Sequence, residues 1–178
     1  LIDGVPLLAF PGVLPDMAIY ERVDVLRGPN ALFSGAGNPA GSINLVRKRP
    51  VCDFNLSGTL SIGSWQNYRG QADVNGTIGD DADICFRVVA AHQDQDFFYD
   101  VAHQTRTTLY AVADVSVTPD TTITIGGQYQ DSEIPLFTGL PGYAGLPTGG
   151  LIDFPRDTFI GAQWAGNKAR DLLGFIEL

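Results

Sequence analysis

Polar and apolar residues alternate with a period of two through most of the chain after Pro50. In residues 54–63 the even positions hold Phe, Leu, Gly, Leu and Ile, whereas the odd positions hold Asn, Ser, Thr, Ser and Gly. Because successive side chains of a β-strand point to opposite faces, this pattern predicts strands with one apolar and one polar face. A partial sixth strand is predicted over 168–178. The five complete predicted strands are 54–63, 68–79, 84–95, 106–118 and 121–131.

The connections between these segments alternate between short polar turns and longer, aromatic-rich loops. Tight turns are predicted at 79–83 and 119–120, and loops at 64–67, 97–105 and 134–167. This arrangement is typical of an outer-membrane β-barrel, in which the apolar face meets lipid and the polar face lines the lumen. The smallest such barrels need about eight strands. We therefore expect the chain to be part of a larger protein.

A soluble antiparallel β-sandwich also alternates apolar and polar positions and is the alternative interpretation. Two features favour the barrel. The polar faces carry charged side chains on several strands, and the apolar faces are rich in Gly and Ala, where a packed sandwich core would hold larger side chains. The charged residues on the polar faces are Arg69, Asp73, Arg87 and Asp114.

The first 50 residues have a different organisation. We predict a strand over 21–26, a break at Gly28 followed by a short helical turn that Pro29 opens, a Gly/Pro loop over 35–41, and a second strand over 42–46. The Gly-x-Gly spacing in the loop resembles part of a dinucleotide-binding motif. A strand follows these glycines, however, where a dinucleotide site needs a helix, so we do not predict a nucleotide site.

Composition and charge support a division at Pro50. The chain has 11 Lys and Arg residues against 20 Asp and Glu residues, and a net charge of −9. Residues 1–50 hold five basic and four acidic side chains, whereas residues 51–178 hold six basic and sixteen acidic ones. An acidic chain without a basic face is not expected to bind nucleic acid. No segment has about twenty consecutive apolar residues, so no transmembrane helix is predicted.

Motifs on both sides of Pro50 resemble one family. The sequence ERVDVLRGP at 21–29, followed by GNPAGSINLV at 37–46 and KRP at 48–50, is similar to the end of the plug domain of TonB-dependent outer-membrane receptors, and most similar to that of ferric-siderophore receptors. GSWQNYR at 63–69 and DFPR at 153–156 resemble the first strands and third outer loop of these receptors.

The resemblance implies a mainly β protein, a transmembrane antiparallel β-barrel of about 22 strands with an N-terminal α/β plug domain in its lumen. Residues 1–50 would be the C-terminal part of the plug and residues 51–178 the first five to six barrel strands. The implied protein is a monomer of the bacterial outer membrane that binds a ferric siderophore and imports it with energy from TonB and its inner-membrane complex, without catalysis. Alternatives are a receptor of this type for cobalamin, haem or carbohydrate, a small non-transporting outer-membrane barrel, and a soluble sandwich that acts as a binding module.

The resemblance also implies roles for particular residues. Phe33 lies where some family members place an aromatic residue of the plug apex against the siderophore, and three loop aromatics are candidates for the same ligand. Two plug arginines resemble those that pair with barrel carboxylates, most of them expected on strands outside this chain. No protein-bound metal or cofactor is predicted, since His92 and His103 are isolated and the iron would arrive already chelated. The loop candidates are Trp65, Phe137 and Tyr143, and the plug arginines are Arg27 and Arg49.

Two cysteines, Cys52 and Cys85, stand near the short-turn side of the predicted sheet. The oxidising compartment that the outer membrane faces would permit a disulfide. The predicted strand 68–79 lies between theirs, and two strand spacings amount to about 9–10 Å, which is too far for a disulfide bond. We therefore predict two free thiols.

Overall fold

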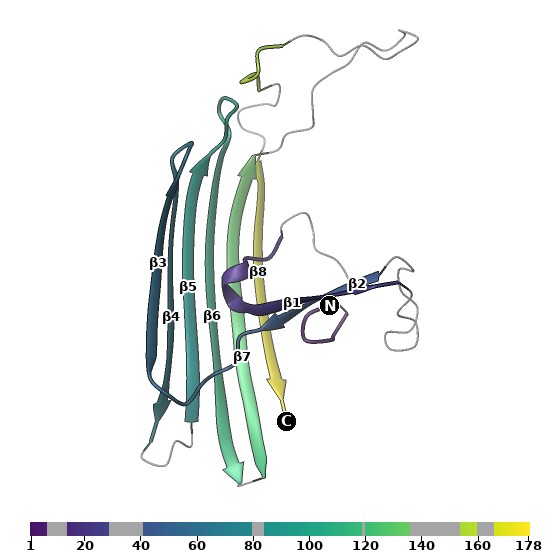
Figure 1. Cartoon of the computed structure of the whole chain (residues 1–178), viewed down its shortest axis with the longest axis vertical. Helices are drawn as coiled ribbons and strands as arrows, with labels where there is room; N and C mark the ends of the chain where they lie inside the picture. Colours follow the sequence, from purple (N-terminus) through teal and green to yellow (C-terminus); the bar gives the residue numbers. More distant parts are fainter. Residues whose placement is uncertain (7–13, 29–40, 80–83, 119, 136–153, 160–165) are drawn as a thin grey trace.

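The computed structural model describes residues 1–6, 14–28, 41–79, 84–118, 120–135, 154–159 and 166–178. Within them, a two-stranded sheet stands beside a tall six-stranded sheet (Figure 1). No helix among these residues is long and apolar enough to span a membrane. The elements in chain order are the 3-10 turn η1 (Met17–Ile19) and the strands β1 (Tyr20–Arg27), β2 (Gly41–Arg47), β3 (Asn55–Gly63), β4 (Asn67–Ile78), β5 (Ile84–Asp96), β6 (His103–Thr118), β7 (Thr121–Pro135) and β8 (Gly166–Glu177).

The large sheet is antiparallel throughout, and each strand from β3 to β8 pairs with the next one in sequence. The alternation in the sequence is the cause of its two different faces. Asp73 and Asn75 of β4 are buried on the face that meets residues 14–20 and 45–52, whereas Tyr68 of the same strand is exposed on the other face. Large apolar side chains project from that outer face along the whole sheet: Leu56, Leu60, Ile62, Ile78, Val88, Leu109, Val117, Ile125, Leu172 and Ile176.

The predicted strands are confirmed, although several are longer than the apolar alternation indicates. β6 begins at His103 instead of residue 106, and β7 continues to Pro135 instead of ending at 131. The added residues are mostly polar, and they continue the ladder of β6 with β7 up to Thr105 and Glu133. Backbone pairing does not require apolar side chains, so the hydropathy pattern stops before the strands do.

The two strands predicted before Pro50 are also present, as β1 and β2, paired from Tyr20 with Arg47 to Arg27 with Gly41. The glycine at the start of β2 is required by a close backbone approach. Gly41 has a φ of 147°, and a Cβ atom there would lie 2.4 Å from the carbonyl oxygen of Leu26. The helical turn predicted at Pro29 and the Gly/Pro loop lie outside the described residues.

The main hydrophobic core lies between the N-terminal part of the chain and the large sheet. It joins apolar side chains from the segment around η1, β1 and β2 to inward-facing residues of β5 and β6. Packing therefore joins the described N-terminal residues of this cluster to the six-stranded sheet, which is here called the wall. The cluster consists of Ile2, Ala18, Ile19, Tyr20, Leu45, Val89, Ala91, Tyr110 and Val112.

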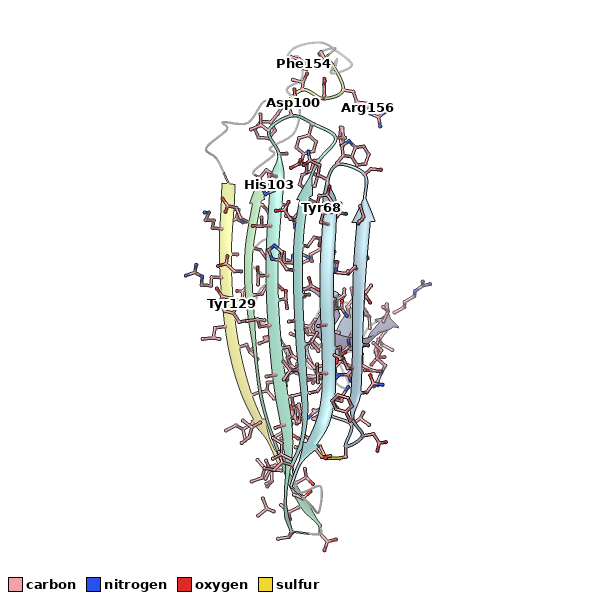
Figure 2. All side chains as sticks on the ribbon, turned by 90° about the vertical axis from the view of Figure 1, so that its left-hand side faces the viewer. Tyr68, Asp100, His103, Tyr129, Phe154 and Arg156 are labelled. Atoms are coloured by element: carbon pink, nitrogen blue, oxygen red, sulfur yellow. A yellow bond between two sulfur atoms is a disulfide. The ribbon has the colours of Figure 1, made fainter. Side chains whose placement is uncertain are left out.

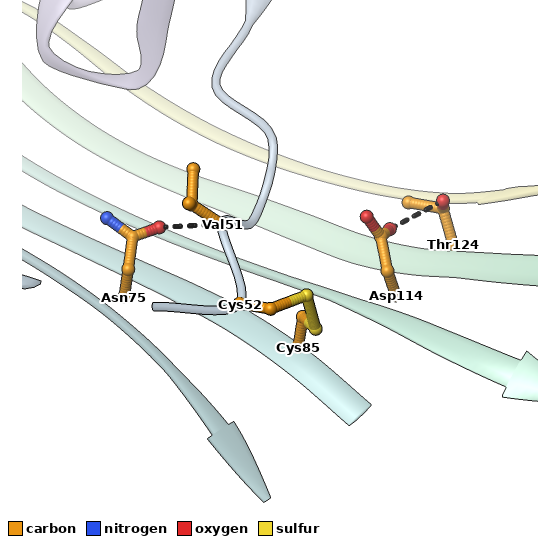
Figure 3. Close-up of a disulfide and its surroundings, with 6 residues drawn as sticks. All are labelled: Val51, Cys52, Asn75, Cys85, Asp114 and Thr124. Atoms are coloured by element: carbon orange, nitrogen blue, oxygen red, sulfur yellow. Dashed lines mark hydrogen bonds between the residues drawn. A yellow bond between two sulfur atoms is a disulfide. The ribbon is translucent and has the colours of Figure 1, made fainter. Parts of the chain in front are cut away.

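The prediction of two free cysteines is wrong. Cys52 and Cys85 form a disulfide with a Cα–Cα distance of 4.9 Å (Figure 3). A separation of two strand spacings applies only if Cys52 lies in line with the first strand of the sheet, but β3 begins only at Asn55. The backbone N–H of Val51 donates to Oδ1 of Asn75 on β4. The chain thus crosses the inner face of the sheet before it enters β3, and Cys52 lies over β5.

Candidate functional site

Residues 47–52, with the sequence RKRPVC, form the passage from β2 to the large sheet and are here called the exit segment. Each of its three cations is paired with a carboxylate. Nε of Arg47 lies 2.5 Å from Oδ2 of Asp3, and Nζ of Lys48 lies 2.8 Å from Oδ2 of Asp73. Arg49 pairs with Glu177 at the end of β8. The exit segment is therefore bound to both the N-terminal region and the wall.

Asp73 is the centre of this arrangement on β4. Besides Lys48 it accepts two hydrogen bonds from Arg87 of β5, from Nε at 2.9 Å and from the terminal nitrogen at 2.9 Å. The other terminal nitrogen of Arg87 donates to the carbonyl oxygen of Arg49 at 3.1 Å. The Tyr110 hydroxyl on β6 donates to the carbonyl oxygen of Lys48 at 2.8 Å. Three neighbouring wall strands thus hold both side chains and backbone of the exit segment.

The two plug arginines named from the sequence have different surroundings. Arg49 has a carboxylate partner within this chain, at Glu177 near the end of β8. Burial acts to lower the pKa of Arg49, but the hydrogen bond to Glu177 and the nearby negative charges outweigh it, so the pKa lies above its ordinary value. Arg27, at the end of β1, is exposed and forms no ion pair with a described residue. Its pairing with a barrel carboxylate stays a prediction.

A second contact between the N-terminal part and the wall centres on Asp16, whose side chain is 2% exposed. Its oxygens accept hydrogen bonds from Arg69 of β4 at 2.7 and 2.9 Å and from the backbone N–H of Ala18 at 2.8 Å, which caps η1. Burial acts to raise the pKa of Asp16, but the Arg69 and Ala18 hydrogen bonds, with the charges of Arg69 and Arg106, bring that pKa below its ordinary value.

A cavity of about 750 Å³ lies between the segment around η1 and the inner face of the sheet. Arg106 lines it and has no ion-pair partner among the described residues, and its Nε atom is buried without a hydrogen bond. The lining is mixed, and a cation without a carboxylate partner at its wall suits an anionic group. The lining residues are Leu14, Pro15, Asp16, Met17, Ala18, Lys48, Arg69, Gln71, Gln93 and Arg106.

Aromatic side chains gather beyond the strand ends opposite the short turns, where Figure 2 shows Asp100, Phe154 and Arg156. Phe97, Phe98 and Tyr99 of the β5–β6 connection, Trp65 of the β3–β4 turn and Phe159 are here called the outer aromatic cluster. Trp65 and Phe98 have ring centroids 6.4 Å apart, and Tyr99 is stacked on Phe159 at 6.1 Å. The backbone N–H of Asp100 donates to the carbonyl oxygen of Asp157 at 2.8 Å, which ties two loops together.

This cluster contains Trp65, one of the four ligand candidates. Trp65 and Phe98 are 58% and 48% exposed, so their ring faces are available to a ligand. The guanidinium of Arg156 lies 5.7 Å from the centre of the Phe98 ring. The other three candidates, Phe33, Phe137 and Tyr143, lie outside the described residues. Nothing in the described part brings three or more His, Cys, Asp or Glu side chains together in a way that could hold a metal ion.

The sequence places charged side chains on the polar faces of the predicted strands but does not show which residues they pair with. Asp73 and Arg87 stand on adjacent predicted strands, and their positions on the same face were the available signal. No signal in the sequence connects them to Lys48, because that contact depends on the path of the exit segment across the sheet. Asp16 was likewise missed as a contact of Arg69.

Comparisons with known proteins place these features in a family context. No protein-family model matches the chain. The ferric-pyoverdine receptor PbuA of a Pseudomonas strain is 36% identical over 99% of this chain, and the ferripyoverdine receptor of Pseudomonas aeruginosa is 37% identical over 92% of it. The chain spans about a fifth of the length of these relatives, 22% and 21% respectively.

A solved structure of a ferripyoverdine receptor also matches nearly the whole chain. The ferripyoverdine receptor of the outer membrane of Pseudomonas aeruginosa, bound to ferripyoverdine, superposes with a TM-score of 0.89 at 33% identity and covers 98% of this chain, which matches 24% of that one. The siderophore receptor PiuA of Acinetobacter baumannii shares the fold, with a TM-score of 0.86 at 22% identity. Over nearly its whole length this chain is therefore a homologue of the ferric-pyoverdine receptors, within the TonB-dependent siderophore receptors of the outer membrane.

Proposed function

We propose that this chain is part of an outer-membrane receptor that binds a ferric siderophore and imports it with energy supplied by TonB. The observation that carries this proposal is the homology to ferric-pyoverdine receptors across 99% of the chain at 36% identity. Within that receptor, residues 1–50 form the C-terminal part of the plug and residues 51–178 form the first barrel strands. The relatives are transport receptors and not enzymes, so the chain's residues would bind and position a ligand.

Two features of the structure support this division. The hydrophobic core and the ion pairs join the first 50 residues to the inner face of a sheet whose outer face is apolar, as expected for a plug inside a lipid-embedded wall. The outer aromatic cluster stands beyond the strand ends on the side of the long loops. A ligand that enters from that side would meet exposed aromatic rings before it reaches the plug.

The proposed ligand is an Fe(III) chelate of the pyoverdine class, bound through Trp65 and Phe98 of the outer aromatic cluster together with the loop and plug aromatics Phe33, Phe137 and Tyr143. Aromatic faces suit a chelate with flat and apolar parts. A second candidate is another metal chelate, because the metal-pseudopaline receptor of Pseudomonas aeruginosa is 33% identical over 62% of this chain.

The test uses the full-length receptor in iron-starved bacteria that lack their own ferric-siderophore receptors, with uptake of radioactive iron as the measurement. Ferric pyoverdine is expected to be imported in a strain with TonB and not in one without it. Trp65→Ala and Phe98→Ala should each weaken binding by about tenfold, the effect of losing a well-placed aromatic contact.

Phe54→Ala is the matched control, because Phe54 is also exposed but lies at the opposite end of the sheet, before β3. Uptake of a pseudopaline–metal complex without ferric-pyoverdine uptake would favour the second candidate. Uptake of neither, by a receptor that is correctly inserted, would refute the proposed function.

A further inference from the structure

The Cys52–Cys85 disulfide gives the N-terminal part of the chain a second covalent connection to the wall. The backbone enters the sheet through β3, whereas the disulfide bonds the same segment to β5, and β4 stands between these two strands. Cys85 is the second residue of β5 and is buried on the inner face. The exit segment is thus fastened to the wall before its backbone becomes part of it.

The bond also shortens the free length of chain between plug and wall. From Arg47 at the end of β2 to Asn55 at the start of β3 there are eight residue steps, which could extend to roughly 26–29 Å if all contacts were lost. With Cys52 held, only five steps remain, or roughly 17–18 Å. The disulfide therefore removes the last three residues from any movement of the plug end.

The non-covalent contacts of the exit segment lie on the plug side of this bond. Lys48 is held by Asp73 and Tyr110, Arg49 by Glu177 and Arg87, and the Val51 backbone by Asn75. A pulling force on the plug would break these reversible contacts first, and the Cys52–Cys85 disulfide would then resist further movement.

We propose that the Cys52–Cys85 disulfide retains the C-terminal end of the plug on strand β5 while the rest of the plug moves. This proposal rests on the proposed function for its role in transport, but the retention itself can be measured without transport. It predicts that the exit segment opens to solvent less readily while the bond is intact than after the bond is broken.

The exit segment supplies its own reporter, because trypsin cleaves after Arg47 and Lys48 once the backbone is released. The purified full-length receptor is exposed to trypsin at increasing urea concentrations, as wild type, as wild type reduced by a thiol reagent, and as the Cys52→Ser/Cys85→Ser double variant. Cleavage within residues 47–49 is read by mass spectrometry. The reduced and double-variant proteins should be cut about tenfold faster than the oxidised protein at moderate urea, because proteolysis follows the open population.

Asn75→Ala is the matched control, because it removes a hydrogen bond to the same segment and leaves the disulfide in place. It should change the cleavage rate much less than loss of the disulfide. Equal cleavage of oxidised, reduced and double-variant receptors would overturn the proposal. The reduced wild type keeps the test decisive if the double variant fails to fold.

The second arm measures the same cleavage in outer membranes with ferric pyoverdine and energised TonB. Cleavage that rises only when the disulfide is absent supports retention of the plug end during transport. Cleavage that rises equally in oxidised receptor refutes that role. A receptor that binds no ferric pyoverdine shows no change in this arm, which marks failure of the proposed function, while the urea arm still decides whether the bond retains the plug end.

Discussion

Replacement of Asp73 by Asn tests whether the exit segment is held by charge. Asp73 is the common acceptor for Lys48 of the exit segment and Arg87 of β5. The substitution keeps the size of the side chain and removes its negative charge. The two cations then remain beside each other on the inner face of the sheet, without their shared carboxylate.

The size of the effect follows from burial. The side chain of Asp73 is 6% exposed and those of Lys48 and Arg87 are each 14% exposed, so water screens this group only weakly. Removal of one partner from a buried ion pair costs about 3–5 kcal/mol. Arg87 keeps Glu21 at 3.6 Å and its hydrogen bond to the carbonyl oxygen of Arg49. We therefore expect a loss at the lower end, about 3 kcal/mol, for detachment of the exit segment from the wall.

The assay measures release of the exit segment by urea in the full-length detergent-solubilised receptor, and tryptic cleavage of that segment is the readout. With a slope of about 1–3 kcal/mol per molar urea, a loss of about 3 kcal/mol moves the midpoint down by about 1–3 M. Asp53→Asn is the control, because Asp53 is an exposed carboxylate just beyond the exit segment.

A double-mutant cycle separates charge from packing. If the excess positive charge causes the loss, Lys48→Met should recover part of it in the Asp73→Asn background, although Lys48→Met alone is destabilising. An Asp73→Asn midpoint equal to that of Asp53→Asn would show that the charge of Asp73 does not hold the exit segment.

Three further predictions address the neighbouring contacts. Because the pKa of Asp16 is lowered in the folded protein, its contact with Arg69 should stabilise the fold above the ordinary pKa of 3.8 and lose this effect as the pH falls through the lower folded value. The difference in urea midpoint between wild type and Asp16→Asn should therefore shrink only below pH 3.8. Gly126→Ala should destabilise the protein by about 1–3 kcal/mol in thermal unfolding, since its Cβ atom would lie 2.4 Å from the Phe175 ring, and Phe175→Leu in the same chain should relieve the loss. Tyr110→Phe should make release of the exit segment easier by about 1 kcal/mol in the urea assay, because one buried hydrogen bond to Lys48 is lost. An unchanged midpoint would show that this hydrogen bond does not hold the exit segment.

The sequence was sufficient to predict the strands of the six-stranded sheet, and the division into two parts at Pro50 stays a prediction. Each strand needs one apolar face and one polar face, and this requirement produces the alternation in every strand separately. The alternation did not predict where the strands end toward the outer loops. There the added residues, such as His103 and Glu133, are polar, and backbone pairing alone extends the ladder.

The disulfide and the contacts of the exit segment could not be predicted from the sequence for a different reason. Both depend on the path of residues 48–54, which cross the sheet without forming a strand of their own. A prediction that counts strand spacings places Cys52 in line with β3, whereas the hydrogen bond from Val51 to Asn75 holds it over the neighbouring strands. Contacts between parts far apart in sequence are fixed by packing, and hydropathy patterns carry no information about them.

The distribution of the exit-segment partners gives this segment a structural role beyond that of a linker. Lys48 and Cys52 are bonded to β4 and β5, whereas Arg49 is bonded to Glu177 on β8 at the edge of the described sheet. The strands β4 and β8 are four spacings apart, or about 19 Å along the wall. Lys48 and Arg49 are consecutive residues, and their side chains nevertheless pair with carboxylates on strands that stand four spacings apart. The exit segment therefore links β4, β5 and β8 across the inner face of the sheet.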